Sequence, residues 1–277
     1  MCDACRLARR PPADHADEPH AARAHGAPAY AAALLGDERL GSTQLHVMRA
    51  GLARQMQHAA GNRTVGRILA RTLKTGAAVD AMLVASDFFK PYVEPKQKAG
   101  TKADGNVHIH AAAAFKTEVL KYLKGKTNPK TNKVYTDDEA VEQEKTVRGF
   151  QDKATGQIHV HESRGDSGTV VHEAMHLFAS QKFVDAVGYH PNEGTTEIFT
   201  RKLCAANSIP RAGYPSQFAS VNKVVALSNE TMLADAYFDG KLQPVIDKVD
   251  KAKGAGTWTK WLASMTAGKF ADADALL

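Results

Sequence analysis

The amino-acid sequence predicts an α+β fold arranged around one buried helix in the second half of the chain. Before residue 165, short stretches of alternating apolar character predict strands, and helical stretches lie between them. An apolar stretch with helical spacing predicts a packed helix from about 167 to 180, and the chain after residue 213 is helical throughout. We therefore expect a small sheet before this helix and a helical lobe after it.

Residues 1–75 differ in composition from the rest of the chain. They contain 11 Lys and Arg against 6 Asp and Glu, whereas residues 76–277 contain 25 against 24, so the leader carries nearly all of the net charge of +6. Roughly the first forty residues are rich in Ala, Arg, His and Pro and are expected to be disordered. Because no apolar run is long enough for a signal peptide or a bilayer span, we expect cytoplasmic synthesis without a signal peptide and no membrane span.

The second part of the leader predicts two short amphipathic helices that are broken at Gly61-Asn62. Its string MQHAAGNRTVGRIL resembles the LQRxAGNxAVxRLL element of proteins encoded beside extracellular contractile injection systems. The resemblance implies that residues 1–75 load the chain onto an injection particle as a toxin or effector. A helical pair that only caps the following domain is the alternative. No base-reading or aromatic pattern points to nucleic acid as a partner.

The segment before the central helix predicts strands and helices in alternation. The strand NVHIH is followed by a helix over 111–123, and Thr136 begins another helix. The segment 149–162 reads as a hairpin, with GFQD and QIHVHE as strands and KATG as the turn. Each of the two His-x-His pairs, at 108 and 110 and at 159 and 161, shares one face of its strand. We interpret them as half-exposed strand histidines rather than as a second metal site.

The central helix carries the arrangement HExxH, formed by His172, Glu173 and His176. Residues four apart lie on the same face of a helix, so both imidazoles can point at one metal ion. Glu173 lies beside them, where it can act on a water molecule without being a ligand. Asp166 and Ser167 are the candidate N-cap residues, and capping explains Asp166 better than does its place in an Arg-Gly-Asp tripeptide.

A second helix is predicted in the stretch PNEGTTEIF, in which Glu193 follows His176 after sixteen intervening residues. Pro191 suits the first turn of a helix, and Glu193 and Glu197 are then one turn apart on the same face. A catalytic zinc site uses three protein ligands and leaves a fourth position open. Glu193 is the candidate for the third ligand.

Together the two motifs resemble the gluzincin superfamily of zinc peptidases, over roughly residues 155–205. The resemblance implies a zincin-like catalytic domain over 76–277, with His172, His176 and Glu193 as zinc ligands and Glu173 as general base. It also implies that Glu197 orients a ligand histidine. Zincins place an edge strand, which pairs with an extended peptide, just before the HExxH helix, so 157–162 is expected to be that edge strand.

The chain also departs from related zinc peptidases. Its spacing of sixteen residues is shorter than in thermolysin-like enzymes and zinc aminopeptidases, so the connection between the two helices must differ. The aminopeptidase signature GxMEN is absent, which disfavours an exopeptidase. A metzincin would need glycine and histidine where this chain has Ala179 and Lys182, so that subclass is excluded.

A hydrogen-bond donor is usually needed to stabilise the oxyanion that forms during peptide hydrolysis. The candidates lie near or after the third ligand in the chain and are Tyr189, His190, Tyr214 and Tyr237. Tyr214 is favoured because it follows the ligand helix. The sequence alone does not choose among the four, since buried tyrosines often serve only in packing.

The rest of the chain reads as scaffold. Helices are expected at roughly 215–226, 229–238, 242–252 and 256–266, with Trp258 and Trp261 packing the last. Cys204 is expected to be a small core residue. Cys2 and Cys5 lack the framework of a zinc finger, and with three cysteines in all, disulfides are not expected to stabilise the fold.

These observations predict a zinc-dependent endopeptidase that acts on proteins or peptides and uses a water molecule activated by Zn²⁺. The leader adds the expectation of delivery as a toxin or effector of a contractile injection system, by release or by injection into target cells. Two alternatives remain open. One is a non-catalytic structural or loading component of an injection particle, and the other is a zinc hydrolase of non-peptide amides.

Overall fold

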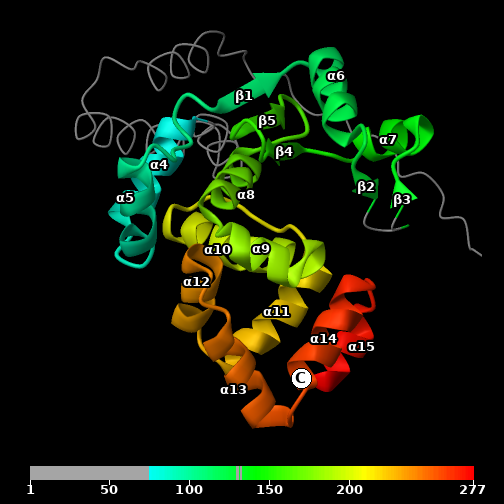
Figure 1. Ribbon diagram of the computed structural model, residues 1–277. Helices are drawn as coiled ribbons and strands as arrows, with labels where there is room; N and C mark the ends of the chain where they lie inside the picture. Colours follow the sequence, from blue (N-terminus) through cyan, green and yellow to red (C-terminus); the bar gives the residue numbers. More distant parts are fainter. Residues whose placement is uncertain (1–74, 129–130, 132) are drawn as a thin grey trace, which may run out of the picture. The chain divides into compact units, whose positions relative to one another are not determined.

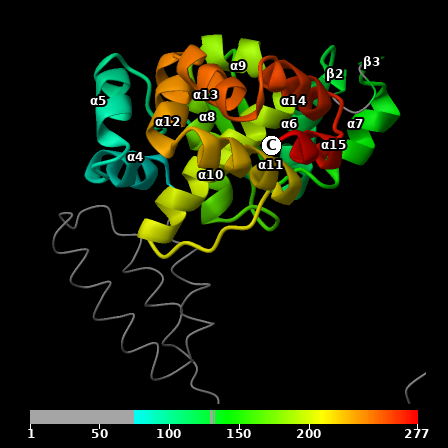
Figure 2. The same ribbon diagram turned by 90° about the horizontal axis from the view of Figure 1, so that it is seen from below.

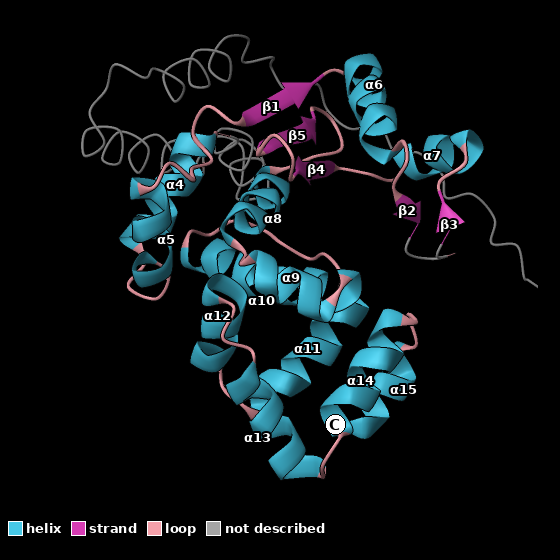
Figure 3. Cartoon of the chain, in the orientation of Figure 1, coloured by secondary structure: helices cyan, strands magenta, loops and turns pink. Residues whose placement is uncertain are grey.

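The structure, a computed structural model, describes residues 75–277 apart from 129, 130 and 132. The described residues belong to one compact unit, Ala53–Leu277. They form an α+β fold that is mostly helical and has a small sheet, which confirms the predicted class (Figure 1, Figure 3). The predicted leader, with its disorder, its two short helices and its first two cysteines, lies outside the described residues except for residue 75.

The helices and strands fall into two groups along the chain: those that precede the hairpin of residues 149–161, and those from this hairpin onward. The first group is α4 (Gly76–Ala85), α5 (Lys90–Lys98), β1 (Val107–His110), α6 (Ala112–Leu123), β2 (Thr127–Asn128), β3 (Lys133–Val134) and α7 (Asp137–Glu144). The second group is β4 (Gly149–Asp152), β5 (Gln157–His161), α8 (Ser167–Phe178), α9 (Gln181–Val187), α10 (Tyr189–Ala206), α11 (Pro215–Leu227), α12 (Glu230–Asp239), α13 (Gln243–Lys253), α14 (Thr257–Thr266) and α15 (Phe270–Leu276).

The three-stranded sheet has the order β1-β5-β4. The predicted hairpin is confirmed, since β4 and β5 pair antiparallel with Asp152 opposite Gln157. The prediction that 157–162 is the edge strand is wrong, because β1 pairs in parallel with the other side of β5. β5 is therefore the central strand, and β4 is the edge strand next to it.

Both faces of β5 are covered. Ile158 and Val160 point into the main core, which they share with residues of α8. On the opposite face, His159 stacks on Phe150 at 4.7 Å between ring centroids, and His161 meets Phe115 of α6 edge-on. His159 and His161 are thus buried rather than half-exposed, because α6 covers their face of the sheet.

Helix α8 begins with a capping box. The Asp166 carboxylate accepts a hydrogen bond of 2.7 Å from the backbone N–H of Thr169, and the Thr169 side chain accepts one from the backbone N–H of Asp166. The capping role predicted for Asp166 is confirmed. The helix ends at Phe178, two residues before the predicted end, where Ala179 turns to an extended conformation. Apolar residues on its other faces pack into the main core.

The two helices of the predicted metal site are not consecutive, because the short helix α9 lies between them. Gly188 ends α9 and precedes α10 with φ of 72° and ψ of −168°, a conformation that favours glycine. Pro191 lies in the first turn of α10, as predicted. The short spacing between the motifs is therefore accommodated by α9 and this sharp turn.

The chain after residue 213 is helical, which confirms the prediction for α11 to α14 within one or two residues at each end. The final helix, α15, was not predicted. Trp258 and Trp261 are buried, and the Trp261 indole N–H donates to the Ser220 hydroxyl at 3.2 Å. Helices α13 and α15 pack against α11, and α14 packs against α10, α13 and α15 (Figure 2). None of the helices in 75–277 combines the length and apolar character needed to cross a bilayer.

The close contact between α10 and α11 at Gly194 predicts what one added methyl group would do to stability. A Cβ at Gly194 of α10 would lie 2.6 Å from the Gln217 carbonyl oxygen and 2.7 Å from Val221 Cγ2, both on α11. Helix propensity alone would make Gly194→Ala more stable by about 1 kcal/mol. Overpacking should reverse the sign, so we expect destabilisation by about 2 kcal/mol in urea unfolding. A variant more stable than the wild type would contradict this close packing.

Candidate metal centre

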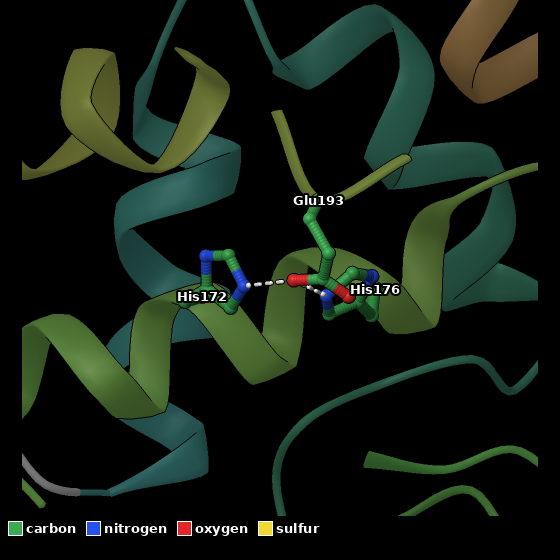
Figure 4. A group of neighbouring side chains, drawn as sticks. All are labelled: His172, His176 and Glu193. Atoms are coloured by element: carbon green, nitrogen blue, oxygen red, sulfur yellow. Dashed lines mark hydrogen bonds and ion pairs between the residues drawn. The ribbon is translucent and has the colours of Figure 1, made fainter. Parts of the chain in front are cut away.

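Helices α8 and α10 bring the predicted metal ligands together. The Glu193 Oε2 atom lies 3.1 Å from His172 Nε2 and 3.5 Å from His176 Nε2. Figure 4 shows the carboxylate of Glu193 between the two imidazole rings. Within the described residues, these three side chains form the group whose ligand atoms all lie within 4.8 Å of one another. The group could hold a metal ion.

The far side of each imidazole is held by other residues. His172 Nδ1 lies 3.3 Å from Glu197 Oε2. His176 Nδ1 lies 3.3 Å from the Thr196 hydroxyl and 3.4 Å from the Asn192 amide. Contacts at Nδ1 fix the orientation of each ring and leave Nε2 available. The two Nε2 atoms and one carboxylate oxygen therefore converge without rearrangement, and this donor set fits a divalent metal.

Glu197 is completely buried and is held from three directions. Arg201, one turn further along α10, donates to its Oε1 at 2.8 Å. Arg211 donates twice to its Oε2, at 2.9 and 2.6 Å, and the backbone N–H of Gly213 donates to Oε1 at 2.8 Å. Each carboxylate oxygen thus has several donors, which compensates for the loss of water around a buried charge.

The two arginines and Gly213 were not among the residues predicted for the site. Arg201 follows Glu197 by four residues in a predicted helix, so helical spacing was a usable signal for this ion pair. Arg211 and Gly213 lie in the irregular segment between α10 and α11, where no periodicity indicates which side chains turn inward.

Charge is distributed unevenly over the centre. Burial opposes protonation of His172, but hydrogen bonds to Glu193 and Glu197 outweigh it and raise the His172 pKa to about 9. Burial alone would raise the pKa of Glu193, yet His176 and His172 hold it far below the usual value. The carboxylates therefore favour a positive charge at the imidazoles, which a proton supplies in one state and a metal cation can supply in another.

Glu173 lies in a different environment from the other two glutamates. It is 7% exposed, and burial raises the pKa of its carboxyl group. In the part of the chain that the structure describes, no hydrogen bond engages its carboxylate. A Cβ added at Gly149 would lie 3.3 Å from Glu173 Cγ, so the edge strand β4 runs directly beside it.

Of the four candidate oxyanion donors, Tyr214 is the one that the fold brings next to the group formed by His172, His176 and Glu193. Its ring stacks on that of His172, with 4.9 Å between centroids and an angle of 14°. The Glu193 charge, together with burial and a hydrogen bond to Glu193, raises the Tyr214 pKa well above its usual value, so the hydroxyl stays protonated. Tyr214 has φ of 45°, an uncommon left-handed conformation for a residue with a side chain.

The other three candidates are differently placed. The Tyr237 hydroxyl is fully buried and is bonded to the Thr196 hydroxyl and to the Met175 carbonyl. His190 contacts Gln217 and the ring of Phe270. Tyr189 is 46% exposed and interacts with the Tyr214 hydroxyl. The structure therefore brings Tyr214 to the group, with Tyr189 beside it, while Tyr237 and His190 serve in packing.

The remaining histidine pairs and the one described cysteine lie apart from this group. His110 and His159 contact each other at 3.0 Å between ring nitrogens, on the face of the sheet that α6 covers. Cys204 is buried, as predicted, and burial raises its pKa to about 12. A neutral thiol in this position serves in packing.

The Glu197 network predicts a specific loss of stability. Glu197→Gln keeps the side-chain volume but leaves Arg211 without a buried counter-charge. We expect the free energy of unfolding of the metal-free protein to fall by about 3 kcal/mol in urea titrations. Glu230→Gln is the matched control, because it removes the partner of the half-exposed Lys202 and should cost less than about 1 kcal/mol. Equal losses in the two variants would contradict a structural role for the network.

Comparisons with family models, with curated proteins and with solved structures found no match. We therefore infer the function of the chain from the side chains that form the centre and from their surroundings.

Proposed function

We propose that this chain is a zinc-dependent endopeptidase. The observation that carries the proposal is the convergence of two imidazole nitrogens on one carboxylate oxygen: His172 Nε2 lies 3.1 Å and His176 Nε2 3.5 Å from Glu193 Oε2. Two imidazoles and one carboxylate, with a fourth position open, are the donor set of catalytic zinc sites in peptidases. When bound, zinc supplies a Lewis acid that polarises a carbonyl group and acidifies a water molecule.

Glu173 is the general base of this proposal. It follows the ligand His172 directly in α8, and its carboxylate is buried but free of hydrogen bonds among the described residues. A raised pKa brings a carboxylate closer to the range in which it can accept a proton and later release it. Glu193 and Glu197 cannot serve in this way, because histidines and arginines hold their pKa values low.

Tyr214 is the proposed oxyanion donor. Its hydroxyl remains protonated at neutral pH and lies next to the metal-binding carboxylate, where negative charge on a substrate oxygen would develop. The stacking on His172 and the left-handed backbone hold the ring in one orientation. A donor that is already oriented stabilises the transition state without a reorganisation cost.

The edge strand β4 is the proposed binding site for the substrate backbone. It pairs with β5 on one side and runs past Glu173 at Gly149. A peptide in extended conformation can pair with an exposed strand edge through main-chain hydrogen bonds. This edge would place a peptide bond near the metal group, and that favours a peptide over a small amide as the substrate.

Delivery by an injection particle is a separate proposal, based on the leader's resemblance alone. The alternative is that the chain is a structural or loading component of an injection particle and that its metal site only stabilises the fold. A particle component of that kind would bind metal without cleaving any peptide. The same donor set also binds iron(II) in oxygenases, so metal identity and cleavage must be measured together.

Glu173→Gln tests the catalytic proposal directly. We expect one zinc per chain in both wild type and variant, because residue 173 is not a ligand. Cleavage should fall by about a thousandfold, since the variant cannot accept a proton. Elemental analysis measures the metal, and proteome-wide cleavage profiling measures the activity. Glu142→Gln, an exposed change on α7, is the control, and a Glu173→Gln protein as active as this control would refute the assigned base.

Tyr214→Phe tests the oxyanion donor. The variant keeps the ring on His172 and loses only the hydroxyl, so zinc content should not change. We expect kcat to fall by about a hundredfold with little change in KM, because the hydroxyl would act in the transition state. Tyr92→Phe, which removes a hydroxyl bonded to Asp235 on α12, serves as the control. A wild-type kcat for Tyr214→Phe would assign this role elsewhere.

A further inference from the structure

A polar cavity opens directly beside the proposed metal group. It has a volume of about 310 Å³ and includes His176 in its wall. Its other walls come from β4 and the β4–β5 turn, from the segment 100–106, and from the start of α9. Ligand sites of this size are at the small end of the range for protein pockets, so the cavity suits one side chain or chain end rather than a large ligand.

The charged residues that line the cavity are all basic. Lys102 lies on one wall and Lys153 on another, and neither Asp nor Glu lines it. Burial lowers the Lys153 pKa, while the charges of Asp185 and Glu193 raise it, so this ammonium group lies within electrostatic reach of the metal-binding carboxylate. Asp185 is engaged by the Gln181 amide at 2.6 Å and is not part of the lining.

One amide of the cavity wall is not used by another side chain of the wall. Gln151 of β4 is 8% exposed, and its side chain forms no hydrogen bond with the described residues. The other two amides of the lining are already used, since Asn106 donates to the Lys102 carbonyl and Gln181 donates to Asp185. The Gln151 amide is not among the fully buried polar atoms that lack a partner, so it can donate a hydrogen bond into the cavity without first leaving another side chain.

We propose that this cavity is a substrate subsite for a carboxylate group, bound by Lys153, Lys102 and the Gln151 amide. The inference rests on the proposed peptidase function, which it deepens by naming the preferred substrate class. A carboxylate accepts hydrogen bonds from ammonium and amide groups and is attracted by two positive charges. The carboxylate comes either from an Asp or Glu side chain near the cleaved bond or from the substrate's own C-terminus.

The position of Gln151 connects the subsite to the metal group. Gln151 lies two residues after Gly149 on the same edge strand, and Gly149 lies against Glu173. A peptide paired with β4 would therefore pass the proposed base and reach the cavity within a few residues. The subsite then selects a residue close to the cleaved bond, which main-chain pairing alone cannot do.

The test uses a library of end-blocked peptide pairs that differ only by Glu or Gln at one position. With zinc-loaded full-length protein, we expect kcat/KM to favour Glu over Gln about tenfold at one position near the cleaved bond. Lys153→Gln should reduce this preference to about threefold, and the double change Lys102→Gln and Lys153→Gln should abolish it. Lys182→Gln, an exposed lysine of α9 outside the lining, should leave it unchanged.

Equal cleavage of both members of each pair, together with equal cleavage of peptides with free and amidated C-termini, would overturn the inference while leaving the peptidase proposal intact. A preference for the carboxylate that survives the double change would overturn it too. A second set of peptides with free or amidated C-termini separates the two sources of the carboxylate. If free C-termini are preferred over amidated ones and Glu is not preferred over Gln, the chain end occupies the cavity. Higher salt should weaken the preference in either case.

Affinity selection keeps the subsite testable if no peptide is cleaved. The same library is passed over immobilised, zinc-loaded Glu173→Gln protein, and the retained peptides are identified by mass spectrometry. Enrichment of Glu over Gln without any cleavage by the wild type would refute the peptidase proposal and support a carboxylate site. No enrichment and no cleavage would overturn both.

Discussion

The buried carboxylate of Glu197 is the constraint on which the rest of the centre depends. A charge removed from water must be fully compensated, and here the compensation comes from α10 itself, from the segment before α11 and from His172 on α8. This requirement fixes α8, α10 and the start of α11 relative to one another. The segment that supplies Arg211 and Gly213 leads directly into Tyr214. The Glu197 carboxylate therefore sets both the orientation of the His172 imidazole and the place of the Tyr214 ring that stacks on it.

Helix α8 packs into the core and also carries two of the candidate metal ligands, and the helical period keeps the two sets of residues on different faces. Val170, Val171, Ala174 and Met175 are buried in the main core, while His172, Glu173 and His176 share the remaining surface with α10 and β4. Because all sides are packed, the functional residues cannot change their positions independently of the core. The rigidity that a metal group needs thus comes from ordinary hydrophobic packing rather than from additional cross-links.

Local features of this chain were predictable from sequence, and non-local ones were not. The cap at Asp166, the hairpin turn before Gln157 and helices α11 to α14 depend on neighbouring residues, and each was predicted. The central position of β5 depends on β1, which pairs with it across nearly fifty residues of intervening chain. The burial of His159 depends on α6 in the same way. Arg211 lies in an irregular segment, where only the folded structure shows that it turns inward.

The three glutamates of the centre illustrate how one residue type acquires different properties from its surroundings. Histidine and arginine neighbours hold the pKa values of Glu193 and Glu197 low, so both remain charged and suited to binding a cation or orienting an imidazole. Glu173 lacks such hydrogen bonds, and burial raises its pKa. Neighbouring carboxyl groups whose pKa values are pushed apart are typical of sites that divide electrostatic and proton-transfer roles. Under the proposed function, Glu193 would hold the metal ion and Glu197 would orient His172, while Glu173 would accept and release the proton.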